Sequence, residues 1–108
     1  ATLAARLSYY AGEYEASVVL LEEMLDNTRD ERISKRYAKR LQALQGAITL
    51  ERAVSRYREL YGDRPATLQE LVMAGVVDNL PDEPYGGEWY MKENGRVYST
   101  SKFVDELK

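Results

Sequence analysis

Residues 99–102, Ser-Thr-Ser-Lys, are the part of the chain best suited to nucleophilic chemistry. A serine that is activated by lysine needs that lysine to be buried with a lowered pKa, and it needs an oxyanion site nearby. Neither is expected at a strand end that faces water. Glu22 and Glu23 are adjacent, and adjacent residues do not face each other on a helix, so they do not form a carboxylate pair. We therefore predict no catalytic residues and no enzymatic activity.

The chain contains no cysteine and no histidine. This composition excludes disulfides, thiolate nucleophiles, cysteine- or histidine-bound zinc and the commonest general base. Gly86 and Gly87 precede a predicted strand, whereas a phosphate-binding loop leads into the start of a helix. We predict no cofactor.

The most distinctive segment is residues 83–87, Glu-Pro-Tyr-Gly-Gly. One interpretation is a recognition loop that holds a calcium ion through hard oxygen ligands. The acids available for this are Asp82, Glu83, Glu88 and Asp105. Their spacing resembles no loop of known ligand geometry, so we favour a fixed turn in which Tyr85 packs against the preceding long helix. We predict no metal ligand.

A basic segment lies between two acidic flanks. The net charge is −3, yet residues 29–64 carry ten basic groups against five acids. A stripe of cations opens this segment: Arg29, Arg32, Lys35, Arg36, Lys39 and Arg40. The stripe is able to bind phosphate or anionic lipid, but we favour a solvated face, or one paired with acids of residues 22–26. The acidic total argues against a nucleic-acid partner.

Hydrophobic spacing predicts a single α+β domain over residues 1–108 that is predominantly helical. Residues 1–27 form a helical pair interrupted at Gly12, and residues 28–61 form a long helix. A capping box of Thr28 and Glu31 starts the long helix. Gly46 marks a bend, a break or the close approach of another helix.

The second half of the chain is predicted to form shorter helices and strands than the first half. It is predicted to contain a short helix over residues 66–75, a Pro/Gly loop over 76–87, a β-hairpin over 88–100 and a tail over 101–108. The short helix opens with a capping box of Thr67 and Glu70.

The hairpin turns at residues 94–95, Asn-Gly, a pair typical of a two-residue type I′ turn. This turn places Met91 opposite Tyr98, on the same face as Trp89. An isolated hairpin is marginal in water. We therefore expect this face to pack against the tyrosine-bearing end of the long helix.

Nine tyrosines are an unusual number for 108 residues. Tyrosine is enriched at interfaces because its ring is apolar and its hydroxyl forms hydrogen bonds. Tyrosines 9, 10, 14 and 37 are therefore candidates for a peptide groove between helices, although tyrosines 9 and 10 are equally suited to the core. Tyr37, Tyr57 and Tyr98 are expected in the core. The candidate partner-binding residues are Tyr9, Tyr10, Tyr14, Arg36, Arg40 and Tyr85.

Residues 9–17, followed by Leu21 and Met24, resemble a tetratricopeptide repeat. Gly12 lies where that family has a glycine near the inter-helix turn, and Tyr14 lies where it has an aromatic. Met24 is larger than the residue usual there, and the first helix lacks the Trp and Leu-Gly signature. The resemblance covers about one repeat. It implies further repeats upstream or a lone terminal unit, because about three repeats are needed to bury a continuous core.

Residues 47–101 resemble the soluble part of a type II secretion pseudopilin or a related type IV pilin-like protein. The matching positions are Tyr57, Tyr61, Gly62, Pro65, Thr67, Leu68, Leu71, Pro81, Glu83, Pro84, Tyr85, Gly86 and Trp89. The family usually has Asp in place of Glu83 and Trp in place of Tyr85. Charged residues 29–40 stand where its hydrophobic assembly helix would lie. The resemblance implies a pilin-type C-terminal module, with a calcium ion near the sheet as in several pseudopilins, but not a filament subunit.

We expect a scaffold or adaptor that binds a protein or peptide partner through its helical half. The alternatives are a self-assembly module, in which the hairpin end packs against other copies as a homo-oligomer, and a calcium-stabilised ligand-binding domain. The resemblances alone suggest a bacterial envelope or secretion system, on the periplasmic side rather than in the cytoplasm. No apolar run is long enough to insert in a membrane. The chain begins at Ala1 inside a helical pattern, so we expect it to be part of a longer protein.

Overall fold

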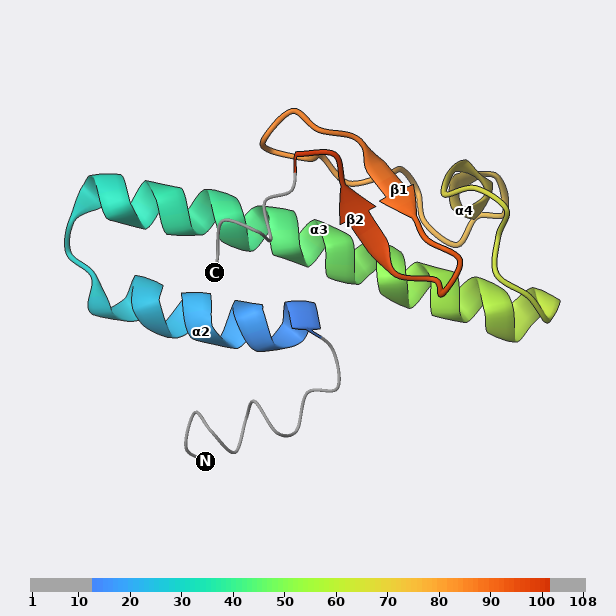
Figure 1. The fold of residues 1–108 in the computed structure, drawn as a ribbon, viewed down its shortest axis with the longest axis horizontal. Helices are drawn as coiled ribbons and strands as arrows, with labels where there is room; N and C mark the ends of the chain where they lie inside the picture. The colour runs from blue at the N-terminus through green and yellow to red at the C-terminus, as the bar shows by residue number, and fades with distance from the viewer. Residues whose placement is uncertain (1–12, 102–108) are drawn as a thin grey trace.

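The computed structural model describes residues 13–101, in which three helices are followed by two strands (Figure 1). They are α2 (Glu13–Asn27), α3 (Glu31–Tyr61), α4 (Gln69–Met73), β1 (Trp89–Met91) and β2 (Val97–Ser99). The expected predominantly helical α+β fold is confirmed over these residues. The first helix expected within residues 1–12 and the tail after residue 101 lie outside the described residues.

Helix α2 runs antiparallel to the first half of α3, and the two helices share a core (Figure 1). Its buried members are Tyr14, Leu21, Ala43, Leu44, Ala47 and Ile48. On α3 they recur three or four residues apart, so the helix presents one apolar stripe to α2. Full burial of a leucine side chain such as Leu44 stabilises the fold by about 1.5–3 kcal/mol.

Helix α3 is a single helix of 31 residues that starts later than predicted. Its N-cap is Asp30 rather than Thr28, and the Asp30 carboxylate accepts hydrogen bonds from the main-chain N–H groups of Arg32 (2.9 Å) and Ile33 (3.3 Å). Aspartate caps a helix at least as well as threonine, so the helix begins after Asp30 and not after Thr28. The helix ends at Gly62, whose φ of 84° is the left-handed conformation that favours glycine.

Helix α3 continues without a break through Gly46, and the absence of a side chain there gives room to the indole of Trp89. A Cβ atom at position 46 would lie 2.9 Å from Trp89 Cζ2 and 3.5 Å from Pro81 Cβ. The indole is held there by a hydrogen bond that its Nε1 donates to the Pro81 carbonyl (2.8 Å). Close approach is therefore the correct one of the three predicted roles, but the group that approaches belongs to the hairpin and not to a helix.

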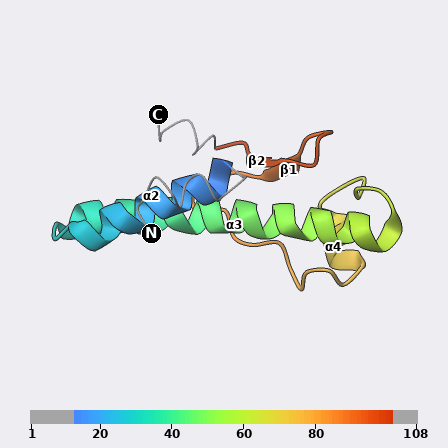
Figure 2. The same ribbon diagram turned by 90° about the horizontal axis from the view of Figure 1, so that it is seen from below.

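The hairpin and α4 build a second core on the second half of α3 (Figure 2). Its buried members are Leu50, Ala53, Val54, Leu68, Leu71 and Val97. Tyr57 packs at the edge of this core, whereas Tyr61 is 58% exposed. The hairpin thus packs on the long helix as predicted, but it lies over residues 46–54 more than over the tyrosine-bearing end.

The hairpin register differs by one residue from the predicted one. The observed pairs are Trp89 with Ser99, Tyr90 with Tyr98 and Met91 with Val97. The cause is the turn: Gly95 N–H donates to the Lys92 carbonyl and Lys92 N–H donates to the Arg96 carbonyl, both at 2.9 Å. These bonds close a three-residue loop in place of a two-residue one. A one-residue slip exchanges the faces of a strand, so Val97 rather than Tyr98 faces α3.

Helix α4 is shorter than the predicted residues 66–75, and its N-cap, Leu68, makes no side-chain capping bond. The predicted capping box of Thr67 and Glu70 is therefore wrong: the Glu70 carboxylate accepts a hydrogen bond from the Ala66 N–H (2.8 Å), one residue before Thr67. Gly75 has a φ of 75°, as expected for the residue that ends this turn of helix.

Candidate functional site

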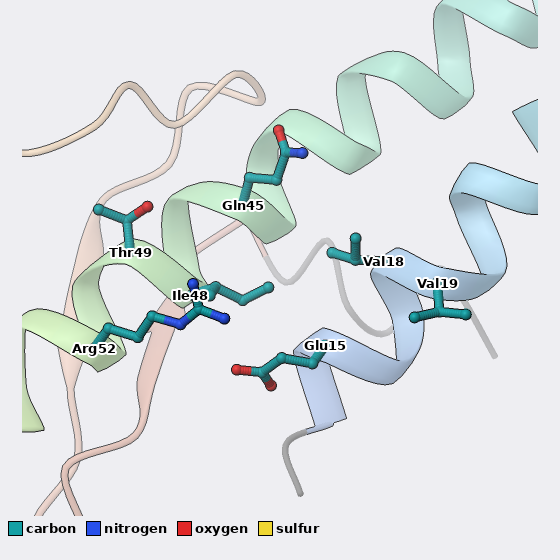
Figure 3. Close-up of a pocket in the computed structure, with 7 residues that line it drawn as sticks. All are labelled: Glu15, Val18, Val19, Gln45, Ile48, Thr49 and Arg52. Atoms are coloured by element: carbon teal, nitrogen blue, oxygen red, sulfur yellow. The ribbon is translucent and has the colours of Figure 1, made fainter. Parts of the chain in front are cut away.

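A groove lies between the first turns of α2 and the middle of α3 (Figure 3). It has a volume of about 230 Å³ and is lined by Glu15, Val18, Val19, Gln45, Ile48, Thr49 and Arg52. We call this the α2–α3 groove. Its floor is apolar because Val18 and Ile48 also border the first core. Its rim is polar because Gln45, Thr49 and Arg52 lie on the exposed face of α3.

Two opposite charges stand at the mouth of this groove. Figure 3 shows the Glu15 carboxylate and the Arg52 guanidinium extending toward each other from α2 and α3, yet no ion pair joins these two described side chains. The Oε2 atom of Glu15 is screened from solvent and has no hydrogen-bond partner. An unsatisfied buried acceptor costs about 1–3 kcal/mol.

The groove continues along α3 as a second hollow of about 430 Å³. The hollow shares Glu15 and Arg52 with the groove and adds Glu51, Ser55, Arg56 and Glu59. Because a helix rises 1.5 Å per residue, residues 45–59 span about 21 Å. The combined surface is therefore long and shallow, with an apolar patch at one end and mixed charges along the rest.

Of the predicted partner-binding residues on the amino-terminal side, only Tyr14 is described. Tyr14 is 1% exposed, and its hydroxyl donates to the Val97 carbonyl at 2.5 Å. It is therefore a core residue that joins α2 to the hairpin, and it does not line the α2–α3 groove. Tyr9 and Tyr10 lie outside the described residues.

The remaining predicted partner-binding residues do not line this groove either. Arg36 is exposed, Arg40 is half-buried, and Tyr85 packs against the first core with the Lys39 ammonium 4.6 Å from its ring centroid. Tyr85 therefore packs against the long helix, as the fixed-turn interpretation proposed.

The basic stripe of α3 is largely solvated in the part of the chain that is described. Lys35 pairs with Glu31 (3.6 Å), and both side chains are more than three-quarters exposed. No ion pair links Arg29, Arg32 or Arg36 to the acids that the described part of α2 carries, although such pairing was one of the expected arrangements.

The Glu83 carboxylate organises the Pro/Gly loop. It accepts hydrogen bonds from the N–H groups of Tyr85 (2.8 Å) and Gly87 and from the Ser99 hydroxyl (2.8 Å). Burial acts to raise the pKa of Glu83, but these hydrogen bonds outweigh burial and hold the pKa below its ordinary value. Ser99 also bonds the Ser101 hydroxyl at 3.0 Å. The two serines considered for nucleophilic chemistry thus serve as structural partners of Glu83.

No group of three or more metal-ligating side chains converges within residues 13–101. Asp105, one of the four acids considered for calcium, lies outside that range. The carboxylate oxygens of Glu83 accept hydrogen bonds from protein donors, and these bonds hold the loop to β2.

No local pattern in the sequence indicates the cluster that joins Glu51 to the hairpin. The Glu51 carboxylate accepts hydrogen bonds from Arg96 Nε (2.8 Å) and from the Val97 N–H (2.9 Å). Burial acts to lower the pKa of Arg96, but the bond to Glu51 and its negative charge raise the pKa above the ordinary value. The Arg96 guanidinium also lies 5.0 Å from the Tyr14 ring centroid. A separation of 45 residues leaves no local signal for such a pair.

Comparison with known proteins found no matching family model, no matching curated protein and no matching solved structure. Over residues 13–101, no helix combines the length and apolar character needed to cross a bilayer.

Proposed function

We propose that this domain is a non-enzymatic adaptor that binds a segment of another protein along the α2–α3 groove. The observation that carries the proposal is an accessible apolar floor beside a polar rim that carries opposite charges. Val18 is only half-buried on that floor, and Glu15 and Arg52 line the groove without an ion pair between them. A bound segment would cover the floor and pair with these charges.

The shape of the surface favours a protein segment over a small molecule. Pockets for small molecules usually enclose about 300–1,000 Å³ and bury most of the ligand. The groove holds only about 230 Å³ and opens into the second hollow instead of closing. A length of about 21 Å matches about 14 residues of helix, the usual form in which an amphipathic segment occupies a groove.

The charges of the surface indicate which segment fits. Acids and bases are both present, with Glu15 and Glu59 beside Arg52 and Arg56. We therefore expect a partner helix with a short apolar stripe at one end, which covers Val18, and with both acidic and basic side chains along its flanks.

The non-enzymatic part of the proposal is supported by how the potentially reactive side chains are used. Ser99 is 3% exposed and donates to Glu83, and Ser101 contacts Ser99. These groups hold the loop to the strand. Assignment to a bacterial envelope or secretion system is likewise a proposal, and its support is the pair of sequence resemblances alone.

Site-specific photo-cross-linking tests the groove. A photoreactive benzoylphenylalanine is placed at Thr49, on the rim of the groove, in cells that produce the protein. The matched control is Gln42, which is exposed on the same face of α3 and lies two turns, or about 10 Å, away outside the groove lining. We expect a discrete heterologous adduct from position 49 and at least a fivefold lower yield from position 42.

Two outcomes would count against the proposal. Equal yields from both positions would show that contact at position 49 is not specific to the groove. An adduct composed of two copies of this chain would place a second copy in the groove. Circular dichroism of both labelled proteins verifies that each is folded as the wild type is.

A further inference from the structure

The first turns of α3 concentrate positive charge at one end of the molecule. Residues 29–40 contain six basic side chains and only two acids, Asp30 and Glu31. The net charge of this segment is +4 within a chain whose total is −3, so the remaining residues sum to −7. A charge distribution this uneven produces a field that orients the molecule toward a negatively charged surface.

Four of these cations share one exposed face of the helix. Their spacings of three and four residues place them on the same side of α3. They are Arg32, Lys35, Arg36 and Lys39, all exposed, and we call this surface the basic face. It points about 150° around the helix from Tyr37 and Leu41, which pack against the first core. Helix α2 therefore lies on another side of α3 and does not cover the basic face.

The acids nearest in sequence leave most of this charge in place. The Asp30 carboxylate is used as the N-cap of α3. Glu31 pairs with Lys35 at 3.6 Å, but both side chains are more than three-quarters exposed, and such a pair is weak. Within residues 13–101 no ion pair involves Arg32 or Arg36.

The rest of the fold leaves the basic face accessible. The first turns of α3 extend beyond the hairpin and beyond α4, so neither element lies over them (Figures 1 and 2). Residues 32–39 span about 10 Å along the axis. A row of cations on one side of a straight helix is able to meet a flat surface with all of its members at once.

We propose that the basic face binds the surface of a bilayer that contains anionic phospholipids, with α3 lying along the headgroups. Clusters of four or more lysines and arginines on a helix are attracted to such surfaces. The contact is electrostatic and peripheral, since no helix in residues 13–101 is long and apolar enough to cross the bilayer.

A bilayer fits this surface better than a nucleic acid does. A planar partner meets the basic face alone, whereas a flexible polyanion also approaches the acidic remainder of the chain and is repelled there. Single-strand binders combine cations with exposed aromatic rings on which bases stack. The aromatic ring beside the basic face is that of Tyr85, which is half-buried with the Lys39 ammonium 4.6 Å from its centroid.

The basic face and the α2–α3 groove lie on different sides of α3. The rim residues Gln45, Thr49 and Arg52 lie about 120° around the helix from the basic face. A bilayer on the basic face would leave the groove open to a partner. This inference therefore goes beyond the proposed function and does not depend on it.

Co-sedimentation of the full chain with vesicles tests the proposal. We expect binding to vesicles of phosphatidylcholine with about one-third phosphatidylglycerol, no binding to pure phosphatidylcholine, and weaker binding as salt is raised. Each cation near an anionic surface contributes about a fivefold gain in binding, so the double variant Arg32→Gln with Arg36→Gln should bind about 25-fold more weakly.

The matched control removes the same charge from other parts of the surface. The double variant Arg58→Gln with Lys92→Gln changes one exposed residue near the end of α3 and one in the hairpin. It should bind anionic vesicles within about threefold of the wild type, because neither residue belongs to the basic face. Circular dichroism verifies that both double variants are folded.

A fluorescent label locates the surface that meets the bilayer. The chain has no cysteine, so Gln42→Cys and Asn94→Cys each introduce a single thiol for an environment-sensitive fluorophore. Position 42 lies two turns after Lys35 on the same side of α3, and position 94 lies in the hairpin turn. Anionic vesicles should shift the emission to the blue at position 42 and leave it unchanged at position 94.

Several results would overturn the proposal. Equal binding to neutral and anionic vesicles would exclude an electrostatic contact. Equal losses in the two double variants, or equal shifts at positions 42 and 94, would show that the basic face is not the surface in contact. Tighter binding to a duplex oligonucleotide than to vesicles at the same phosphate concentration would identify a nucleic acid as the partner instead.

Discussion

Replacement of Gly46 by alanine tests whether the Trp89 indole determines how the hairpin sits on α3. In an isolated helix, alanine in place of glycine stabilises by about 1 kcal/mol. Here the added Cβ would lie 2.9 Å from Trp89 Cζ2, closer than carbon atoms approach without displacement. The indole cannot retreat freely, because its Nε1 bonds the Pro81 carbonyl. Overpacking of this kind costs about 1–3 kcal/mol.

The difference between these two effects gives the expected sign. We expect Gly46→Ala to destabilise the fold by about 1 kcal/mol, which lowers Tm by about 4–8 °C for a domain of this size. In a Trp89→Phe background the smaller ring leaves room for the methyl group. There the same substitution should stabilise by about 0.5–1 kcal/mol, so the two positions should couple by about 1.5–2 kcal/mol.

The assay is urea unfolding of the four proteins in this cycle, followed by far-ultraviolet circular dichroism at low protein concentration. A change of Gln45→Ala, on the exposed side of the same turn of α3, serves as the helix-propensity control and should alter stability by less than about 0.5 kcal/mol. If Gly46→Ala stabilises the wild type as much as the Trp89→Phe variant, the indole is not seated against position 46 and the reasoning is refuted.

Two further changes test the contacts that join the hairpin and the loop. Tyr14→Phe should lower the unfolding free energy by about 1–2 kcal/mol, because it leaves the Val97 carbonyl unsatisfied. Urea unfolding measures this loss. The control is Tyr61→Phe, because Tyr61 is 58% exposed, and an equal loss of stability there would contradict the prediction. The pKa of Glu83 is below its ordinary value of 4.5 in the folded chain, so its stabilisation is present above about pH 4.5 and is lost as pH falls through the folded pKa. The stability difference between wild type and Glu83→Gln, measured by unfolding from about pH 6 to pH 3, should therefore shrink on acidification; a difference that stays constant would argue against the hydrogen-bonded carboxylate.

Much of the fold follows from local signals in the sequence. The apolar spacing predicts one long helix over residues 28–61, and α3 occupies most of that range. Glycines at 62 and 75 end helical segments as expected, each with positive φ. Each of these features depends on neighbours within about four residues, which is the range over which helix periodicity and capping operate.

The candidate site was much less predictable. Tyr14 and Arg36 are among the candidate partner-binding residues; Tyr14 lies in the core, and Arg36 is not part of the lining of the α2–α3 groove. The rim residues Thr49 and Arg52 belong to an ordinary polar stripe of α3. Nothing local distinguishes such a stripe from a solvated face until α2 is placed beside it.

The chain by itself determined where helices and turns form, because capping, periodicity and glycine conformation are local properties. The tertiary structure alone decided why Gly46 is needed, that Tyr14 lies in the core and that Glu51 pairs with Arg96. These outcomes depend on contacts between residues far apart in the sequence, such as Tyr14 with Val97 across 83 positions. The free energy of such contacts depends on how the elements pack, and a single sequence carries no periodic signal for it.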